Sequence, residues 1–163
     1  MQMTERRAAV IALVESAFKE ASSPARSRLV YPGSWETDIL IRSLAAVNDQ
    51  PNDVFIEAHS DSLAEFTPEG LRHVLPYYMR YGLEHRGSEW GITVEDSLLF
   101  HLSPLTPGDE YWQGRIAVFS PIQKRAICQY LRHIQEERGG TEVDREIFAR
   151  AFAIWCPLHN TKM

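Results

Sequence analysis

Cysteine is scarce in this chain: its 163 residues include only two, Cys128 and Cys156. With 44% apolar residues the chain can bury a full-sized core without disulfide or metal staples. Both cysteines lie at apolar positions of expected helices, where a free cysteine behaves as a small hydrophobic side chain. We therefore expect two reduced, structural cysteines in a reducing compartment. A disulfide or a reactive thiol is the alternative.

Long apolar runs are also missing. None approaches the roughly 20 residues that a bilayer-spanning helix needs. The N-terminal sequence Met-Gln-Met-Thr-Glu-Arg-Arg is not followed by the apolar segment of a signal peptide. These absences predict a soluble, cytoplasmic protein.

Basic residues are in the minority, and the formal net charge is −5. The imbalance is concentrated between residues 36 and 69, where eight acids face one base, Arg42. The rest of the chain holds 16 bases and 14 acids. Proteins that bind nucleic acid usually carry a basic surface, and none stands out in this sequence. Nucleic acid is therefore not an expected partner.

Sequence motifs of catalysis are absent. There is no Gly-x-Ser-x-Gly turn for a nucleophilic serine, and no glycine-rich loop opens a helix as a phosphate site would require. Neither cysteine has a basic neighbour that would activate a thiolate. The sequence therefore predicts a protein that is not an enzyme. A small hydrolase that uses clustered Asp, Glu and His side chains remains the alternative.

Metal-binding motifs are absent as well, although the chain has six histidines. No His-Glu-x-x-His occurs, and Cys156-Pro-Leu-His159 is a single half-site where structural zinc needs four ligands. Glu69 and His73 share one helix face, but such pairs are common. We expect no metal and no cofactor.

What the sequence does contain is helical periodicity throughout. Apolar residues recur at helical spacing in seven segments, of which the third can be two short helices: 4–21, 35–47, 53–66, 68–85, 93–103, 120–138 and 143–155. Residues 104–118 form the longest irregular stretch, and 115–119 is the only strand candidate. The pattern predicts one all-α domain, residues 1–163, with six to seven helices.

The segment 68–85 is the expected centre of this domain. Thr67 can cap its start, Pro68 suits the first helical position, and Glu69 faces the positive end of the helix dipole. Apolar side chains cover two of its faces, so neighbours are expected on more than one side. Pro76 lies in its interior and removes one backbone hydrogen bond.

The block Thr-Pro-Glu-x-Leu-Arg-x-x-Leu-Pro within residues 63–83 resembles a family of small bacterial all-helical domains of unknown function. An early turn at Pro32-Gly33 and a late helix start from Ser120 to Gln123 are similar too. Two departures stand out: Gly70 replaces a small helix former, and 86–93 looks like an insertion. The resemblance implies the helical fold and a bacterial origin, and it implies no chemistry.

An acidic row is the most unusual feature of the sequence. Asp53, Glu57, Asp61 and Glu65 recur every four residues, which would stack them on one face of a continuous helix. Like charges at this spacing repel each other, so the row requires compensation. Three interpretations are open: a solvated helix face, pairing with arginines of the last two helices (Arg125, Arg132, Arg145 and Arg150), or a basic partner protein that docks on the row.

Tryptophans add a second indication. Trp35, Trp90 and Trp112 lie in or beside expected loops, and protein interfaces are rich in tryptophan. Burial of these side chains in small satellite cores beneath the loops is the alternative. The leading interpretation is a non-enzymatic protein-binding protein, most concretely an immunity or antitoxin-like protein that neutralises a basic toxin or nuclease. Its expected partner-binding residues are Asp53, Glu57, Asp61, Glu65, Trp90 and Trp112. A structural assembly subunit is a further alternative, and the sequence leaves the oligomeric state open.

Overall fold

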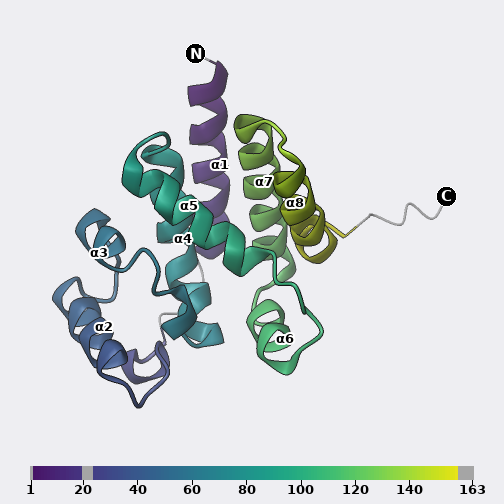
Figure 1. The fold of residues 1–163 in the computed structure, drawn as a ribbon. Helices are drawn as coiled ribbons and strands as arrows, with labels where there is room; N and C mark the ends of the chain where they lie inside the picture. Colours follow the sequence, from purple (N-terminus) through teal and green to yellow (C-terminus); the bar gives the residue numbers. More distant parts are fainter. Residues whose placement is uncertain (1, 20–23, 158–163) are drawn as a thin grey trace.

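The computed structural model describes residues 2–19 and 24–157, which contain eight α-helices (Figure 1). In chain order they are α1 (Gln2–Phe18), α2 (Trp35–Ala46), α3 (Asp53–Ala58), α4 (Pro68–Glu84), α5 (Glu89–Leu102), α6 (Glu110–Ala117), α7 (Pro121–Arg138) and α8 (Glu142–Trp155). Two 3-10 helices, η1 (Arg26–Arg28) and η2 (Leu63–Glu65), join them. The described ranges contain no strand, only an isolated bridge between Val30 and Phe66. The predicted all-α class is confirmed, and 110–117 supplies a helix beyond the expected six to seven.

Helix α4 is the centre of this arrangement (Figure 1). α1 and α3 pack against it from the first half of the chain, and α5 and α6 from the second half. Its side chains Val74, Leu75 and Tyr78 are fully buried and belong to one continuous apolar cluster. The prediction that this helix contacts both halves of the chain is therefore confirmed.

The start of α4 explains the unusual glycine in the family-like block. The Thr67 hydroxyl accepts from the backbone N–H of Gly70 at 3.0 Å and donates to the Arg28 carbonyl at 2.6 Å. The chain at Leu29 therefore crosses the first turn of α4 at close range. A Cβ on Gly70 would lie 1.8 Å from the Leu29 carbonyl oxygen, so only glycine fits.

Two helix boundaries differ from the sequence prediction. α5 begins at Glu89 instead of Thr93, because Ser88 caps it by accepting from the backbone N–H of Gly91 at 3.0 Å. Residues 110–117, expected to be irregular with a strand candidate at their end, form α6 after Asp109. Gly114 lowers the helical signal of that short segment.

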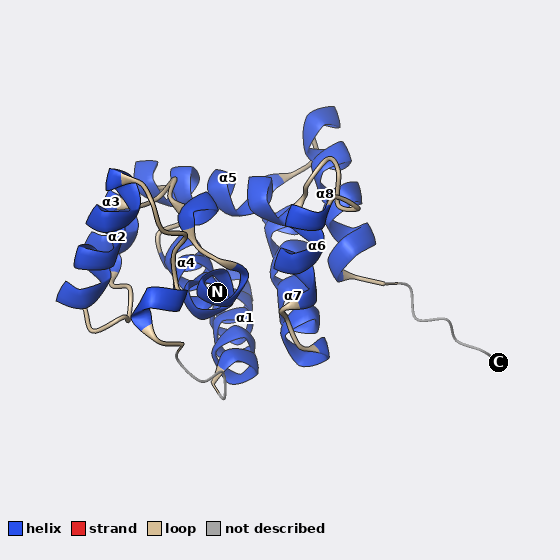
Figure 2. Cartoon of the chain, turned by 90° about the horizontal axis from the view of Figure 1, so that it is seen from below, coloured by secondary structure: helices blue, strands red, loops and turns tan. Residues whose placement is uncertain are grey.

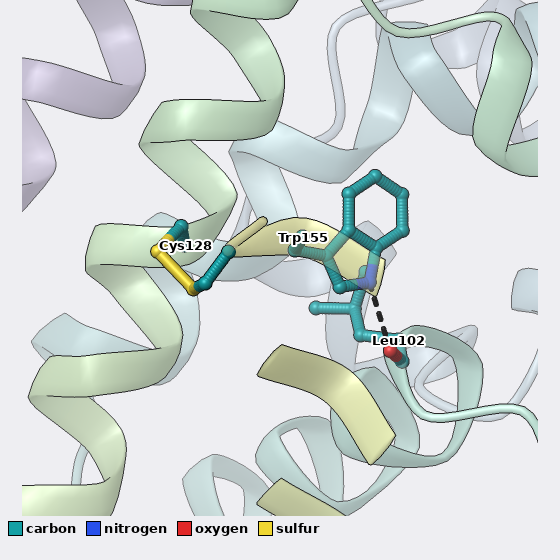
Figure 3. The surroundings of a disulfide bond; sticks show 4 residues. Leu102, Cys128 and Trp155 are labelled. Atoms are coloured by element: carbon teal, nitrogen blue, oxygen red, sulfur yellow. Dashed lines mark hydrogen bonds between the residues drawn. A yellow bond between two sulfur atoms is a disulfide. The ribbon is translucent and has the colours of Figure 1, made fainter. Parts of the chain in front are cut away.

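The cysteine prediction is wrong: Cys128 of α7 and Cys156, just after α8, form a disulfide across a Cα–Cα distance of 5.2 Å (Figure 3). α7 and α8 pack side by side, which brings the two residues within disulfide range (Figure 2). Trp155 anchors the same end of α8, because its indole N–H donates to the Leu102 carbonyl at 2.8 Å. Because the two cysteines are paired, they no longer support the expectation of a reducing compartment.

Residues 2–19 and 24–157 contain no candidate membrane-spanning helix. None of the helices described there combines the length and the apolar character needed to cross a membrane.

Candidate functional site

The acidic row does not lie on one helix. Asp53 and Glu57 belong to α3, which ends at Ala58, while Asp61 lies in the following turn and Glu65 in η2. His59 is the C-terminal cap of α3, and Ser60 turns into the protein with 6% of its surface exposed. The expected stack of four carboxylates is therefore broken after its second member, because serines end the helix more readily than they continue it.

The first two members of the row contact α4. The Tyr81 hydroxyl donates to Glu57 Oε1 at 2.7 Å, and His85 Nε2 lies 3.1 Å from Asp53 Oδ2. The rings of Tyr81 and His85 stack with centroids 4.2 Å apart. Burial, and then the bond to Glu57, raises the pKa of Tyr81, so its hydroxyl stays protonated as the donor. These two carboxylates help to hold α3 on α4.

The other two members remain at the surface. Asp61 is exposed and Glu65 is half-buried, and neither forms an ion pair within the described ranges. Asp61 lies close enough to His59 to oppose the burial that lowers the pKa of that histidine. The row therefore divides into a half bound to α4 and a half open to solvent.

The arginines expected to neutralise the row do not reach it. α7 and α8, which carry Arg125, Arg132, Arg145 and Arg150, pack with α1 and α5, away from α2 and α3 (Figure 1). Arg150 instead donates to the carbonyl of Ser103 at 3.2 Å. The expected pairing with the last two helices is wrong.

A wider acidic surface surrounds the open half of the row. We call residues 34–66, comprising α2, α3 and η2, the acidic lobe; α2 and α3 lie side by side in both views (Figures 1 and 2). The lobe carries seven acids and one base. Glu36 and Asp38, in the first turn of α2, are exposed. Trp35 and Val54 are also exposed, at 70% and 73% of their surface.

The two tryptophans predicted with the row do not form one patch with it. Trp90 lies in the first turn of α5 and is 46% exposed. Trp112 is half-buried in α6, with its ring centroid 6.0 Å from that of His101 near the far end of α5. About 16 Å of helix separates Trp90 from His101 at a rise of 1.5 Å per residue. The two tryptophans therefore lie near opposite ends of α5.

Two adjoining hollows run along α4, and sequence reasoning did not predict them. One, of about 370 Å³, lies between α1 and α4, and the other, of about 590 Å³, lies between α3 and α4. Gln50, Tyr77 and Arg80 line both. The spacing of Tyr77, Arg80 and Tyr81 places them on one stripe of α4, which was the sequence signal available for these hollows. Nothing in the sequence indicated that α1 and α3 flank this stripe.

A cluster of largely buried charges lies elsewhere, between α1, α5, α7 and the end of α4. Glu137 contacts Arg7 at 2.7 Å, His133 at 2.9 Å, and Arg86, while Glu95 contacts Arg86 at 3.1 Å and Arg138 at 3.0 Å. Burial raises the pKa of Glu95, and the two arginines oppose that effect. Each carboxylate of this cluster has its cationic partners, so the cluster fits a structural role.

Metal-ligating side chains do not gather within the described residues: no three His, Cys, Asp or Glu side chains converge there as a metal site would need. His73, which shares a helix face with Glu69, places its Nε2 on the Asp49 carbonyl. Of the Cys156–His159 half-site, the cysteine is in the disulfide and the histidine lies outside the described residues.

Comparison with known proteins gives a family and no activity. The model of a family of unknown function (DUF6714) matches residues 35–155, from the start of α2 to the end of α8. No curated protein and no solved structure matches the chain. The matched range includes the central block that suggested a family of unknown function. Because the match covers well over half of the sequence, the chain belongs to this family of unknown function, DUF6714.

Proposed function

We propose that this protein is a non-enzymatic protein-binding protein that holds a basic partner against the acidic lobe. Its most concrete form is a bacterial immunity or antitoxin-like protein that covers the basic active site of a toxin or nuclease. The observation that supports this proposal is the set of exposed carboxylates on α2 and in the turn after α3, which form no ion pair with any residue that the structure describes. Glu36, Asp38 and Asp61 are its members.

The negative charge of the acidic lobe would mainly affect the rate at which the partner protein associates with it. The lobe carries seven acids and one base over 33 residues, and Arg26 neutralises Asp49 at 2.7 Å. A concentrated field of one sign accelerates the diffusional approach of an oppositely charged protein and makes the association rate depend on salt. Asp53 and Glu57 are engaged by His85 and Tyr81 of α4. Glu36, Asp38, Asp61 and Glu65 form no ion pair within the described ranges, so their carboxylates can face the partner.

Apolar side chains on the same lobe would supply affinity. Trp35 begins α2 beside Glu36, and Val54 follows Asp53 in α3. Isolated exposed hydrophobic residues are ordinary, but a tryptophan among carboxylates matches the aromatic anchors of protein interfaces. We expect Trp35 to be the residue whose truncation weakens binding most.

Charge reversal tests the proposal. The variant Glu36→Lys/Asp61→Lys changes the lobe, and Glu5→Lys/Glu146→Lys changes the net charge equally at exposed positions of α1 and α8. Proteins retained from a lysate of the source cell by the wild-type chain are identified, and the retained basic protein is purified. Its association rate with each variant is then measured at two salt concentrations.

The lobe variant should associate at least about tenfold more slowly at low salt and lose most of its salt dependence. The control variant should change the rate by less than about threefold, since its charges lie far from the lobe. Equal rates for the two variants, or a retained partner that is acidic, would show that the acidic lobe is not the binding surface.

A further inference from the structure

The hollow between α1 and α4 differs from the rest of the protein in charge. Lys19, Arg72 and Arg80 line it together with a single acid, Glu15, so its lining carries +2 in a chain of net charge −5. Its volume of about 370 Å³ lies in the range of small-molecule sites. Gln50 is the one residue of the acidic lobe in its lining, and none of the exposed carboxylates proposed to face the protein partner lines it.

Two of these cations lack a carboxylate partner. Arg80 is paired, because its guanidinium donates to Glu84 at 2.8 Å and to Glu15 at 2.9 Å. Arg72 donates from Nη1 to the Val118 carbonyl at 3.1 Å, and within the described ranges no acid pairs with it or with Lys19. A guanidinium has five N–H donors, so Arg72 keeps donors for an anion after its backbone contact.

The backbone contact also orients Arg72. Val118 lies at the end of α6, so the guanidinium is held between α4 and the α6–α7 connection. An arginine held in this way loses less conformational freedom on binding an anion than a free surface arginine does. The feature therefore differs from a group of solvated surface cations.

Aromatic and apolar side chains complete the lining of the hollow. Pro76 and Tyr77 lie on α4, the helix that carries Arg72, and are half-buried, while Phe18 of α1 is 8% exposed. Burial raises the pKa of Tyr77, so its ring stays neutral. Flat apolar side chains in one hollow with an oriented cation suit a ligand with an aromatic body and an acidic group.

His73 adds a polar group of defined tautomer. Its Nε2 contacts the Asp49 carbonyl, which can only accept, so Nε2 carries the hydrogen. The lining therefore offers cationic donors, an aromatic surface and one imidazole.

We propose that the hollow between α1 and α4 binds a small aromatic anion, with its carboxylate or phosphate on Arg72 and Lys19 and its ring against Tyr77 and Pro76. Carboxylate and phosphate share the recognition chemistry, because both accept paired hydrogen bonds from a guanidinium. The proposed protein partner is not involved in this site.

Isothermal titration with 2-naphthoate, 2-naphthyl phosphate and the neutral 2-naphthylmethanol tests the proposal on the full chain. At least one anion should bind, and the neutral compound should bind about tenfold more weakly, as expected when a charge-assisted hydrogen bond is lost. Preference for one anion identifies the acidic group of the ligand. The absence of binding by both anions at millimolar concentration, or equal binding of the neutral compound, would overturn the proposal.

Three variants locate the bound anion. Arg72→Gln and Lys19→Gln remove the unpaired cations singly, and Arg42→Gln removes an exposed charge of α2 as the matched control. Both hollow variants should weaken binding, Arg72→Gln by about tenfold, while the control leaves it unchanged. Lys19 is exposed, so its variant stays informative if Arg72→Gln fails to fold. Equal weakening by Arg42→Gln would show a general charge effect and overturn the assignment.

Discussion

The guanidinium of Arg115 donates to the backbone carbonyl of Phe66 across 2.6 Å, and its second terminal nitrogen donates to the Leu63 carbonyl at 2.8 Å. Arg115 is on α6 and is 2% exposed, so a charged side chain from the second half of the chain satisfies two carbonyls at the end of η2. Burial lowers the pKa of Arg115, but an arginine still keeps its proton. The contact fixes the turn that leads into α4.

Replacing this arginine should be among the most destabilising changes in the protein. Arg115→Met keeps the apolar volume but removes the guanidinium from the Phe66 carbonyl and leaves the Leu63 carbonyl only the backbone N–H of Phe66 at 3.4 Å, so we expect a loss of about 3 kcal/mol in the free energy of unfolding. Arg132→Met, at an exposed position of α7, is the control and should cost less than about 0.5 kcal/mol. Urea denaturation monitored by circular dichroism measures both. A loss under about 1 kcal/mol for Arg115→Met would mean that water replaces the guanidinium.

The buried imidazole of His101 should make stability depend on pH. Burial, and secondarily the charge of Arg115, lowers the pKa of His101 to about 4. The histidine pKa in the unfolded chain is about 6.5, so between about pH 4 and 6.5 the unfolded chain binds a proton at His101 and the folded chain does not. This contribution is fully present above pH 6.5 and is lost as the pH falls from about 6.5 to about 4, by roughly 3 kcal/mol in all.

His101→Phe isolates that contribution from those of the acids, which titrate in the same range. The difference in unfolding free energy between wild type and variant should change across this pH window and level off above it. Urea denaturation at pH 7, 6, 5 and 4.5 gives that difference. A difference that stays constant over the window would show that His101 is protonated in the folded protein or is exposed to solvent.

Two glycines in helices should respond in opposite directions to alanine. A Cβ on Gly70 would lie 1.8 Å from the Leu29 carbonyl oxygen, whereas the nearest neighbour of a Cβ on Gly114 is a side-chain atom of Pro68 at 3.9 Å. Gly70→Ala must displace backbone and should cost at least about 2 kcal/mol. Gly114→Ala should stabilise the protein by up to about 1 kcal/mol through helix propensity. Thermal melts of the two variants that shift in the same direction would contradict the close approach at Gly70.

These cases show where sequence reasoning succeeded. Local signals placed the caps correctly: Ser120 and Gln123 form the predicted capping box, and Thr67 caps α4. Both are interactions within one turn of helix, so the sequence alone contains them. The all-α class and the central position of α4 followed from the same local periodicity.

The sequence-based predictions that proved wrong concern features that depend on contacts between segments far apart in the chain. The disulfide requires α7 and α8 to bring residues 28 positions apart into register, and no local pattern records that. The segment around Trp90, expected to be a loop, is helical, and Gly91 there allows a close approach to the His85 carbonyl. The prediction that the four acids stack on one helix face was wrong for a related reason. A four-residue spacing places side chains on one face only within a continuous helix, and α3 ends after Ala58.

The disulfide should form in the isolated protein. Intact mass of the denatured, alkylated but unreduced chain should show no alkyl groups on Cys128 or Cys156, and two after reduction. Cys128→Ala/Cys156→Ala should lower the free energy of unfolding by about 2–4 kcal/mol, because the bond closes a medium-sized loop in the unfolded chain. If both thiols are alkylated before reduction, in a protein purified without reductant, the bond does not form. The variant should then match the wild type in stability.

The last prediction separates the two halves of the acidic row. Glu57 accepts from Tyr81 at 2.7 Å on the contact between α3 and α4, whereas Asp61 is exposed. A double-mutant cycle with Glu57→Ala and Tyr81→Phe should therefore give a coupling of about 1 kcal/mol in unfolding free energy. The same cycle with Asp61→Ala in place of Glu57→Ala should give none.

Charge reversal should divide the row in the same way. Glu57→Lys should lower the melting temperature, and Asp61→Lys should leave it unchanged or raise it slightly by relieving repulsion among the acids. If Asp61→Lys proves as destabilising as Glu57→Lys, the open carboxylates have a structural partner, and the acidic lobe has no free charge to offer a basic protein.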